Sequence, residues 1–288
     1  MSSTNSGQTV EFRGTNELAL VADEWNRGGA ESAAERPTIL MLHGGGQNRF
    51  SWKNTGQVLA DHGFHVIALD ARGHGDSDRA PPDADYSVDS LSADVLRVLE
   101  QIGRPVVLIG ASMGGLTSIL VAKEAGPAVV TKLVLVDVVP RFEKDGSAGS
   151  GTSCSAMWTA STTSNRRPTP SPDTCRTASG RRTSTVSRKN LRFRDGRWFW
   201  HWDPAFLTAP PKDDPFGRVE RLEQAAIDLT IPILLIRGKL SDVVSAEGVQ
   251  DFLAKVPAEF VELSDAGHTA AGDDNDAFSE AVVSFVTR

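Results

Sequence analysis

The strongest constraint on the fold is a glycine-flanked serine that follows a short apolar run. Residues 107–109 (Val-Leu-Ile) lead into a G-x-S-x-G motif at residues 110–114, with Ser112 at its centre, and a helix-compatible run follows at residues 116–125. This pattern is typical of a sharp strand-to-helix turn that exposes a serine hydroxyl on a strained backbone. The helix N-terminus then faces any negative charge that develops at the serine. The motif predicts a nucleophilic serine, although a glycine-rich turn without chemistry is the alternative.

Other apolar runs of strand length alternate with helix-compatible segments along the chain. Continuous apolar runs are typical of strands that are buried on both faces of a parallel sheet, and the alternation places helices on both faces. The carboxyl ends of such strands form the ligand-binding edge, so the loops that follow them are the candidate functional segments. The predicted strands are residues 38–42, 65–69, 105–109, 132–138, 231–236 and 260–263, after a strand pair at residues 10–13 and 18–25.

Two of those loops are rich in glycine and polar residues. His43 is followed by three glycines at positions 44–46, and residues 70–77 read Asp-Ala-Arg-Gly-His-Gly-Asp-Ser. Consecutive glycines after a strand let backbone N–H groups approach a ligand closely, which an oxyanion hole requires. A flexible loop without chemistry is the alternative interpretation of residues 43–46.

Composition argues against several other classes of protein. The chain has 288 residues, of which 40% are hydrophobic and 23% charged, which fits one globular enzyme domain with or without an insertion. Its net charge of -7 argues against nucleic acid or an anionic membrane as the main partner. The first eight residues are polar, and the two cysteines, Cys154 and Cys175, have no metal-ligand spacing. We therefore expect a cytoplasmic protein with a small-molecule substrate.

The three glycine-containing motifs, in this order, resemble those of the α/β-hydrolase fold superfamily. More narrowly, they resemble its epoxide-hydrolase-like, esterase and cofactor-free haloperoxidase branch, over roughly residues 10–145 and 191–288. The resemblance implies an α/β fold with a mostly parallel sheet of about eight strands, helices on both faces and an inserted cap. The core then comprises residues 1–140 and 221–288, and the cap insertion residues 141–220. The resemblance implies no metal and no organic cofactor.

A serine nucleophile needs a histidine base and a carboxylate that orients the base. In the α/β-hydrolase fold these groups follow one another in the order serine, acid, histidine. His268 lies just after the last predicted strand, where the resemblance places the base. Asp242 follows the preceding strand and matches the usual position of the acid. Asp137, at the end of the run at residues 132–138, is the alternative acid.

The resemblance also indicates the oxyanion donors and the reaction. The donors would be the backbone N–H groups of Gly45 and Met113. Epoxide hydrolases and haloalkane dehalogenases carry aspartate where this chain has Ser112, so the serine implies acyl transfer. We expect a serine hydrolase that cleaves a small carboxylic ester or lactone through an acyl-enzyme. A perhydrolase or haloperoxidase-like enzyme, a C–C bond hydrolase with the same triad, and a non-catalytic small-molecule receptor are the alternatives.

The central part of the predicted cap has an unusual composition. Ser and Thr make up 19 of the 41 residues from position 147 to position 187, and Leu, Ile and Phe are absent from this segment. A segment of this kind cannot form a core, so its composition predicts disorder or a linker. An altered reading frame is a second explanation. With suitable third bases, the codons from Trp158 to Arg176 regroup into an acidic, helix-favouring string that suits a cap helix.

We therefore hypothesise a pair of compensating frameshifts, one near Ser147 and one near Ser187. The coding DNA tests this hypothesis, because its codons either regroup into that helix or do not.

Three tryptophans follow that segment at alternate positions. Trp198, Trp200 and Trp202 would share one face of an extended strand. Such a face would suit the wall of an apolar acyl or alcohol pocket. The alternative is a cap hairpin that packs on the core.

Overall fold

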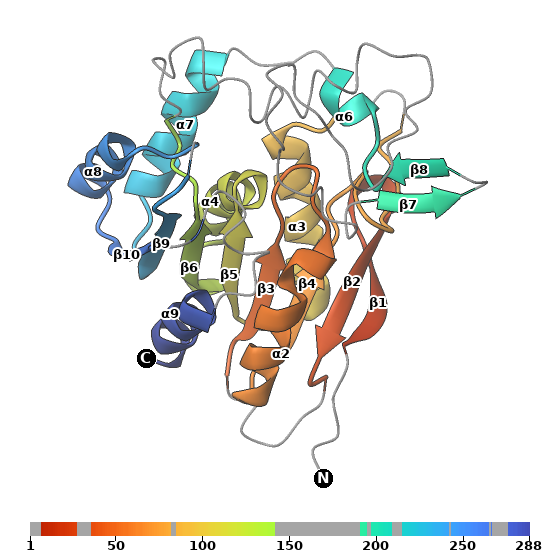
Figure 1. The fold of residues 1–288 in the computed structure, drawn as a ribbon, viewed down its shortest axis with the longest axis horizontal. Coiled ribbons are helices and arrows are strands. Elements are labelled where there is room, and N and C mark those ends of the chain that lie inside the picture. Colours follow the sequence, from red (N-terminus) through yellow and green to blue (C-terminus); the bar gives the residue numbers. More distant parts are fainter. Residues whose placement is uncertain are drawn as a thin grey trace.

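An eight-stranded sheet forms the centre of the protein (Figure 1). The computed structural model describes residues 7–27, 36–81, 85–141, 191–194, 197–208, 215–241, 243–264, 266 and 276–288. The strand order is β1-β2-β4-β3-β5-β6-β9-β10. The strands are β1 (Gln8–Arg13), β2 (Ala19–Trp25), β3 (Thr38–Leu42), β4 (Val66–Leu69), β5 (Val106–Ala111), β6 (Val130–Val136), β9 (Ile233–Gly238) and β10 (Glu259–Leu263). β1 and β2 pair antiparallel, and the pairs from β4 to β10 are parallel, which confirms the predicted mostly parallel sheet.

Helices cover both faces of the sheet, as predicted (Figure 1). One face carries α2 (Lys53–Asp61) and α9 (Asp276–Thr287), and the other carries α3 (Val88–Ile102), α4 (Met113–Ala125), α7 (Pro215–Ile227) and α8 (Ala246–Lys255). Leu108 and Ile109, adjacent in β5, belong to the cores of opposite faces. Successive strand side chains point to opposite faces, so the central strand stabilises both layers.

The two ends of helix α3 are set by capping residues in the sequence. Ser87 precedes the helix, and its hydroxyl accepts a hydrogen bond from Ser90 N–H at 3.2 Å, which satisfies one amide of the first turn. Gly103 ends the helix in the left-handed conformation, with a φ of 65°. Between these caps, Leu91 and Val98 are among the residues that face the core at helical spacing.

The predicted cap region contributes a hairpin and a short helix to the described residues. The hairpin comprises β7 (Leu191–Arg194) and β8 (Arg197–Trp200), and α6 spans Ala205–Thr208. Both lie at the end of the molecule away from the two chain termini (Figure 1). The hairpin corresponds to the alternative interpretation of the tryptophan-rich run. The unusual segment at residues 147–187 lies outside the described residues, and the division into core and cap stays a prediction.

Two element boundaries differ from those expected. Helix α4 begins at Met113, directly after Ser112, and not at residue 116, because the glycines of the motif let the helix start against the strand end. Strand β6 ends at Val136, so Asp137 lies just beyond the strand and not inside it. None of the helices in the described part of the chain is long and apolar enough to cross a membrane.

Candidate active site

Ser112 occupies the turn between β5 and α4 in a strained conformation. Its φ of 47° and ψ of -114° lie where side chains with a Cβ are rarely found. A Cβ on Gly110 would collide with the carbonyl of Gly114, and a Cβ on Gly114 would collide with the carbonyl oxygen of Leu42. Glycine is therefore required at both flanking positions of the motif. Strain of this kind is typical of functional sites.

The start of α4 leaves backbone donors near the serine. The Ser112 carbonyl accepts hydrogen bonds from Gly115 N–H at 2.9 Å and Leu116 N–H at 3.1 Å. The first amide of the helix, Met113 N–H, has no hydrogen bond to any residue that the structure describes. The positive end of the helix dipole adds to the attraction that such an amide exerts on an anion.

The glycine loop after β3 lies beside the serine. A Cβ on Gly44 would lie 3.4 Å from Ser112 Cβ, so this loop packs against the turn that holds Ser112. Gly44 N–H donates to Gln47 Oε1 at 3.1 Å, and Gly46 N–H donates to His74 Nε2 at 3.2 Å. Gly45 N–H makes no hydrogen bond within the described ranges. The loop thus uses its outer two glycine amides internally, whereas the middle amide makes no hydrogen bond to a described residue.

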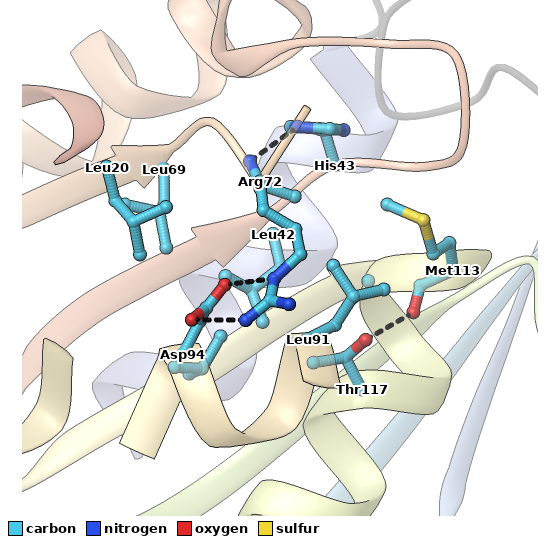
Figure 2. A pocket seen from close by; sticks show the side chains of 12 residues that line it. Leu20, Leu42, His43, Leu69, Arg72, Leu91, Asp94, Met113 and Thr117 are labelled. Atoms are coloured by element: carbon cyan, nitrogen blue, oxygen red, sulfur yellow. Dashed lines mark hydrogen bonds and ion pairs between the residues drawn. The ribbon is translucent and has the colours of Figure 1, made fainter. Parts of the chain in front are cut away.

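Two buried histidines hold this loop in place. His43 donates from Nδ1 to the Gly44 carbonyl at 2.8 Å and accepts Ala71 N–H at Nε2 at 3.0 Å, an interaction drawn in Figure 2. His74 donates from Nδ1 to the Arg72 carbonyl at 3.0 Å. Because each Nε2 must accept an N–H, each ring is neutral with its proton on Nδ1. Neither ring has a nitrogen left to act as the base for Ser112.

Burial also keeps both histidines uncharged. Loss of solvent lowers the pKa of His43 to about 4. Loss of solvent, reinforced by the neighbouring His43, lowers the pKa of His74 to about 3. The two rings lie 5.1 Å apart between centroids. No role for either ring was predicted from the sequence. The signal in the sequence that points to them is their position inside the two glycine-rich loops.

A buried ion pair fixes the loop after β4 behind the site. Arg72 donates from Nε to Asp94 Oδ2 at 2.6 Å and from Nη2 to Asp94 Oδ1 at 2.7 Å, the paired contact shown in Figure 2. A cavity of about 20 Å³ lies between this pair, His43 and Met113. That volume has room for about one water molecule, so it is not a substrate pocket.

Asp137, the alternative acid, lies close to the serine turn. It follows β6, and the register pairs Ala111 of β5 with Val136 of β6, so Ser112 and Asp137 leave neighbouring strands at the same level. Asp137 is 1% exposed and has a left-handed φ of 50°. Its Oδ2 accepts a hydrogen bond from Ser241 Oγ at 2.6 Å.

Asp242 and His268, the predicted acid and base, lie outside the described residues. Their described neighbours meet at one edge of the sheet, because Leu240 N–H donates to the Ala266 carbonyl at 3.0 Å. Ser241 Oγ also lies within 3.2 Å of Val243 N and Val244 N, both of which donate to it. Asp137 therefore anchors the segment that leads into Asp242. No cluster of His, Cys, Asp or Glu able to hold a metal ion occurs among the residues with described positions.

One residue of the tryptophan run, Trp202, lies beside Gly46 of the glycine loop. Trp200 and Trp202 stack with ring centroids 5.7 Å apart. Trp202 is buried, and its Nε1 lies 3.7 Å from the position that a Cβ on Gly46 would occupy. The side chain of Trp198 is outside the described part, so its predicted place in a pocket stays a prediction.

Comparison with known proteins agrees with this architecture. A family model described as the alpha/beta hydrolase fold matches residues 37–152. The esterase Rv0045c of Mycobacterium tuberculosis is 29% identical over 304 residues, covering 94% of this chain and 96% of that protein. The mouse sn-1-specific diacylglycerol lipase ABHD11 is 38% identical over 116 residues, which are 40% of this chain but only 36% of that protein. A crystal structure of the Rv0045c esterase superposes with a TM-score of 0.71 at 26% identity, covering 100% of this chain and 94% of that one.

The sheet order, the strained serine and these likenesses together define the class. The chain has the α/β-hydrolase fold, as the sequence motifs indicated. Its relatives include proteins named esterase and methylesterase.

Proposed function

We propose that the protein hydrolyses a small carboxylic ester through an acyl-enzyme at Ser112. The observation that carries this proposal is that Gly45 and Met113, in the glycine loop beside Ser112 and in the first turn after it, have backbone amides that make no hydrogen bond to a described residue. The esterases among its relatives favour ester hydrolysis over the perhydrolase, C–C hydrolase and receptor alternatives. A lactone is a cyclic ester and falls within the same proposal.

The proposed reaction follows from the roles of these groups. His268 removes the proton from Ser112 Oγ, which attacks the ester carbonyl and forms a tetrahedral oxyanion. Gly45 and Met113 N–H groups donate to that oxyanion, and each such donor contributes about 3 kcal/mol of transition-state stabilisation. His268 then protonates the leaving alcohol. In the second half of the reaction His268 removes a proton from water, which attacks the acyl-enzyme, and then returns the proton to Ser112 Oγ as the acid product leaves. Neither step needs a metal or an organic cofactor.

Asp242 is proposed to orient His268, and Asp137 to hold the loop that carries Asp242. The support is the hydrogen bond from Ser241 Oγ to Asp137, which fixes the residue directly before Asp242. An acid that orients the base contributes a factor of roughly 10⁴ to kcat, whereas a residue that acts through a loop contributes less.

The test measures hydrolysis of p-nitrophenyl acetate by wild type, Ser112→Ala, Asp242→Asn and Asp137→Asn. We expect Ser112→Ala to abolish turnover above background and Asp242→Asn to lower kcat roughly 10⁴-fold. Asp137→Asn should lower kcat less and retain its pH profile, because amide and carboxylate both accept from Ser241. A larger loss with Asp137→Asn than with Asp242→Asn would make Asp137 the acid. Full activity of Ser112→Ala would refute the acyl-enzyme.

A further inference from the structure

We propose that His74 is a positioning residue for the oxyanion hole, because its imidazole holds the peptide unit that follows the proposed donor Gly45. This inference rests on the proposed ester hydrolysis and adds a residue to that same site. His74 lies in the loop after β4, and Gly45 lies in the loop after the neighbouring parallel strand β3. The ring therefore acts between two loops at the edge of the sheet where ligands bind in folds of this kind.

The glycine loop contains a tight turn from Gly44 to Gln47. Gln47 N–H donates to the Gly44 carbonyl at 3.1 Å, and Gly46 has a left-handed φ of 73° whereas Gly45 does not. A positive φ at the third residue alone is the pattern of a type II turn, which differs from a type I turn by rotation of the central peptide unit. Because the residues on both sides of that unit are glycines, little steric hindrance opposes the rotation.

Hydrogen bonds fix the peptide units on both sides of Gly45. The carbonyl of Gly44 accepts from His43 Nδ1 at 2.8 Å, in addition to the hydrogen bond that closes the turn. A peptide unit is planar and trans, so its N–H points away from its carbonyl, and these bonds set the direction of Gly45 N–H. On the other side, Gly46 N–H donates to His74 Nε2 at 3.2 Å. His74 thus keeps the central peptide unit of the turn from rotating.

The His74 ring is itself held in one orientation. Its Nδ1 donates to the Arg72 carbonyl at 3.0 Å, and the side chain is fully buried. The ring meets Phe206 of the short helix α6 edge-on, with centroids 4.8 Å apart and an interplanar angle of 76°. Perpendicular contacts of this kind are favourable for aromatic pairs. The acceptor Nε2 therefore has a fixed place, from which it can restrain the glycine backbone.

The restrained turn lies directly beside Ser112. A Cβ on Gly44 would lie 3.4 Å from Ser112 Cβ, and a Cβ on Gly45 would lie 3.9 Å from the sulfur of Met113. Rotation of the central peptide unit would shift Gly45 relative to both residues. An oxyanion donor acts only within hydrogen-bond distance of the developing charge, and loss of one donor lowers kcat roughly 10²- to 10³-fold. We therefore expect His74 to affect the transition state more than substrate binding.

The experiment compares two amide variants of His74 with p-nitrophenyl acetate as substrate. His74→Gln can place its carbonyl oxygen near the position of Nε2 and accept Gly46 N–H. His74→Asn is one methylene shorter, so it can keep the bond to the Arg72 carbonyl but cannot reach Gly46. We expect His74→Asn to lower kcat about tenfold or more with KM changed less than about threefold, and His74→Gln to keep kcat within about threefold of wild type. His62→Asn, at an exposed histidine that ends α2, is the control and should leave both constants unchanged.

An inhibition constant separates positioning from a loss of folded protein, because it does not depend on the amount of active enzyme. Ser112 Oγ can add to the carbonyl carbon of trifluoroacetone; its proton passes to the base, and the carbonyl oxygen becomes an oxyanion. The corresponding alcohol, trifluoroisopropanol, forms no oxyanion. We expect His74→Asn to weaken inhibition by the ketone about tenfold or more relative to inhibition by the alcohol, and His74→Gln to leave that ratio near the wild-type value.

Wild-type kcat and ketone inhibition in His74→Asn would overturn the inference while ester hydrolysis by Ser112 still stands. Equal losses in the Asn and Gln variants would also overturn it, because the imidazole would then act through its packing and not through its bond to Gly46. Absence of both turnover and ketone inhibition in wild type would instead refute the proposed function on which the inference rests.

Discussion

His43 and His74 are residues that the fold requires in the neutral form. Each accepts a backbone N–H at Nε2, and protonation of that nitrogen removes the hydrogen bond. Their lowered pKa values, about 4 and about 3, lie below the value of about 6.5 of an exposed histidine. Between these limits the unfolded chain binds protons that the folded chain does not bind. Stability therefore increases with pH across this range.

We expect the free energy of unfolding to fall as the pH drops from about 6.5 towards about 4, by up to about 1.4 kcal/mol per pH unit for each histidine. His74→Gln keeps an oxygen that can accept Gly46 N–H but cannot titrate. Its free energy of unfolding should therefore depend less steeply on pH than that of wild type. Urea denaturation of both proteins at a series of pH values measures the two slopes, and identical slopes would contradict the assignment of His74.

The individual residues of the site were predictable to different degrees. The strand-to-helix turn at Ser112 could be predicted, because its glycine pattern is local and the turn leaves few other residues possible, while the catalytic role of Ser112 stays a prediction. His74 could not, because its role depends on Gly46 and Phe206, which are brought to it only by folding. The strained backbone of Asp137 likewise has no sequence signature, since the left-handed conformation is set by its position after β6.

Among the elements, the glycine loop and the short 3-10 helix η2 (Arg49–Trp52) are joined to the sheet by one buried arginine. Arg49 Nε donates to Asp23 Oδ1 of β2 at 2.9 Å, and Nη1 donates to Asp70 and, at 2.7 Å, to Asp76 in the loop after β4. Asp70 is fully buried and also accepts Arg49 N–H at 2.6 Å. Three carboxylates thus share a single guanidinium, and two of the three are largely buried.

Arg49→Met should lower the free energy of unfolding by about 3 kcal/mol or more, because it leaves buried carboxylates without their cation. Arg97→Met is the matched control. Arg97 pairs with Glu100 on the exposed side of α3, with both side chains more than half exposed, so its loss should cost less than about 1 kcal/mol. Denaturant unfolding of both variants provides the comparison, and equal losses would show that the Arg49 cluster does not stabilise the fold.

The elements themselves were largely predictable, and their ends less so. Strand β3 occupies the expected residues, Thr38–Leu42. Its end was predictable because the continuous apolar run stops where the polar and glycine residues of the next loop begin. The helix-compatible run was expected from residue 116, whereas α4 begins at Met113. Helical periodicity in the sequence does not show that the glycines of the motif allow the helix to begin directly after Ser112. The prediction extended strand β6 by two residues, because apolar residues resume at Val138 beyond Asp137, whereas the sheet register ends at Val136.

At the scale of the whole molecule, the sheet order gathers loops that are distant in the sequence at one edge. The loops after β3, β4 and β5 bring the glycine loop, His74 and Ser112 together, and the hydrogen bond from Leu240 to Ala266 joins the loops after β9 and β10. The fold class was predictable because three local motifs carried it. No element could be predicted within residues 147–187, because they show no apolar period, and the cap at residues 141–220 stays a prediction.

Ser112 is proposed to be an activated nucleophile in the folded chain. Intact-mass analysis after exposure to a fluorophosphonate probe tests it most directly, since the probe reacts with serines that a base activates. We expect one label on the folded wild type and none on Ser112→Ala. A folded wild type that takes up no label, or a Ser112→Ala protein that is labelled as fully as wild type, would contradict it.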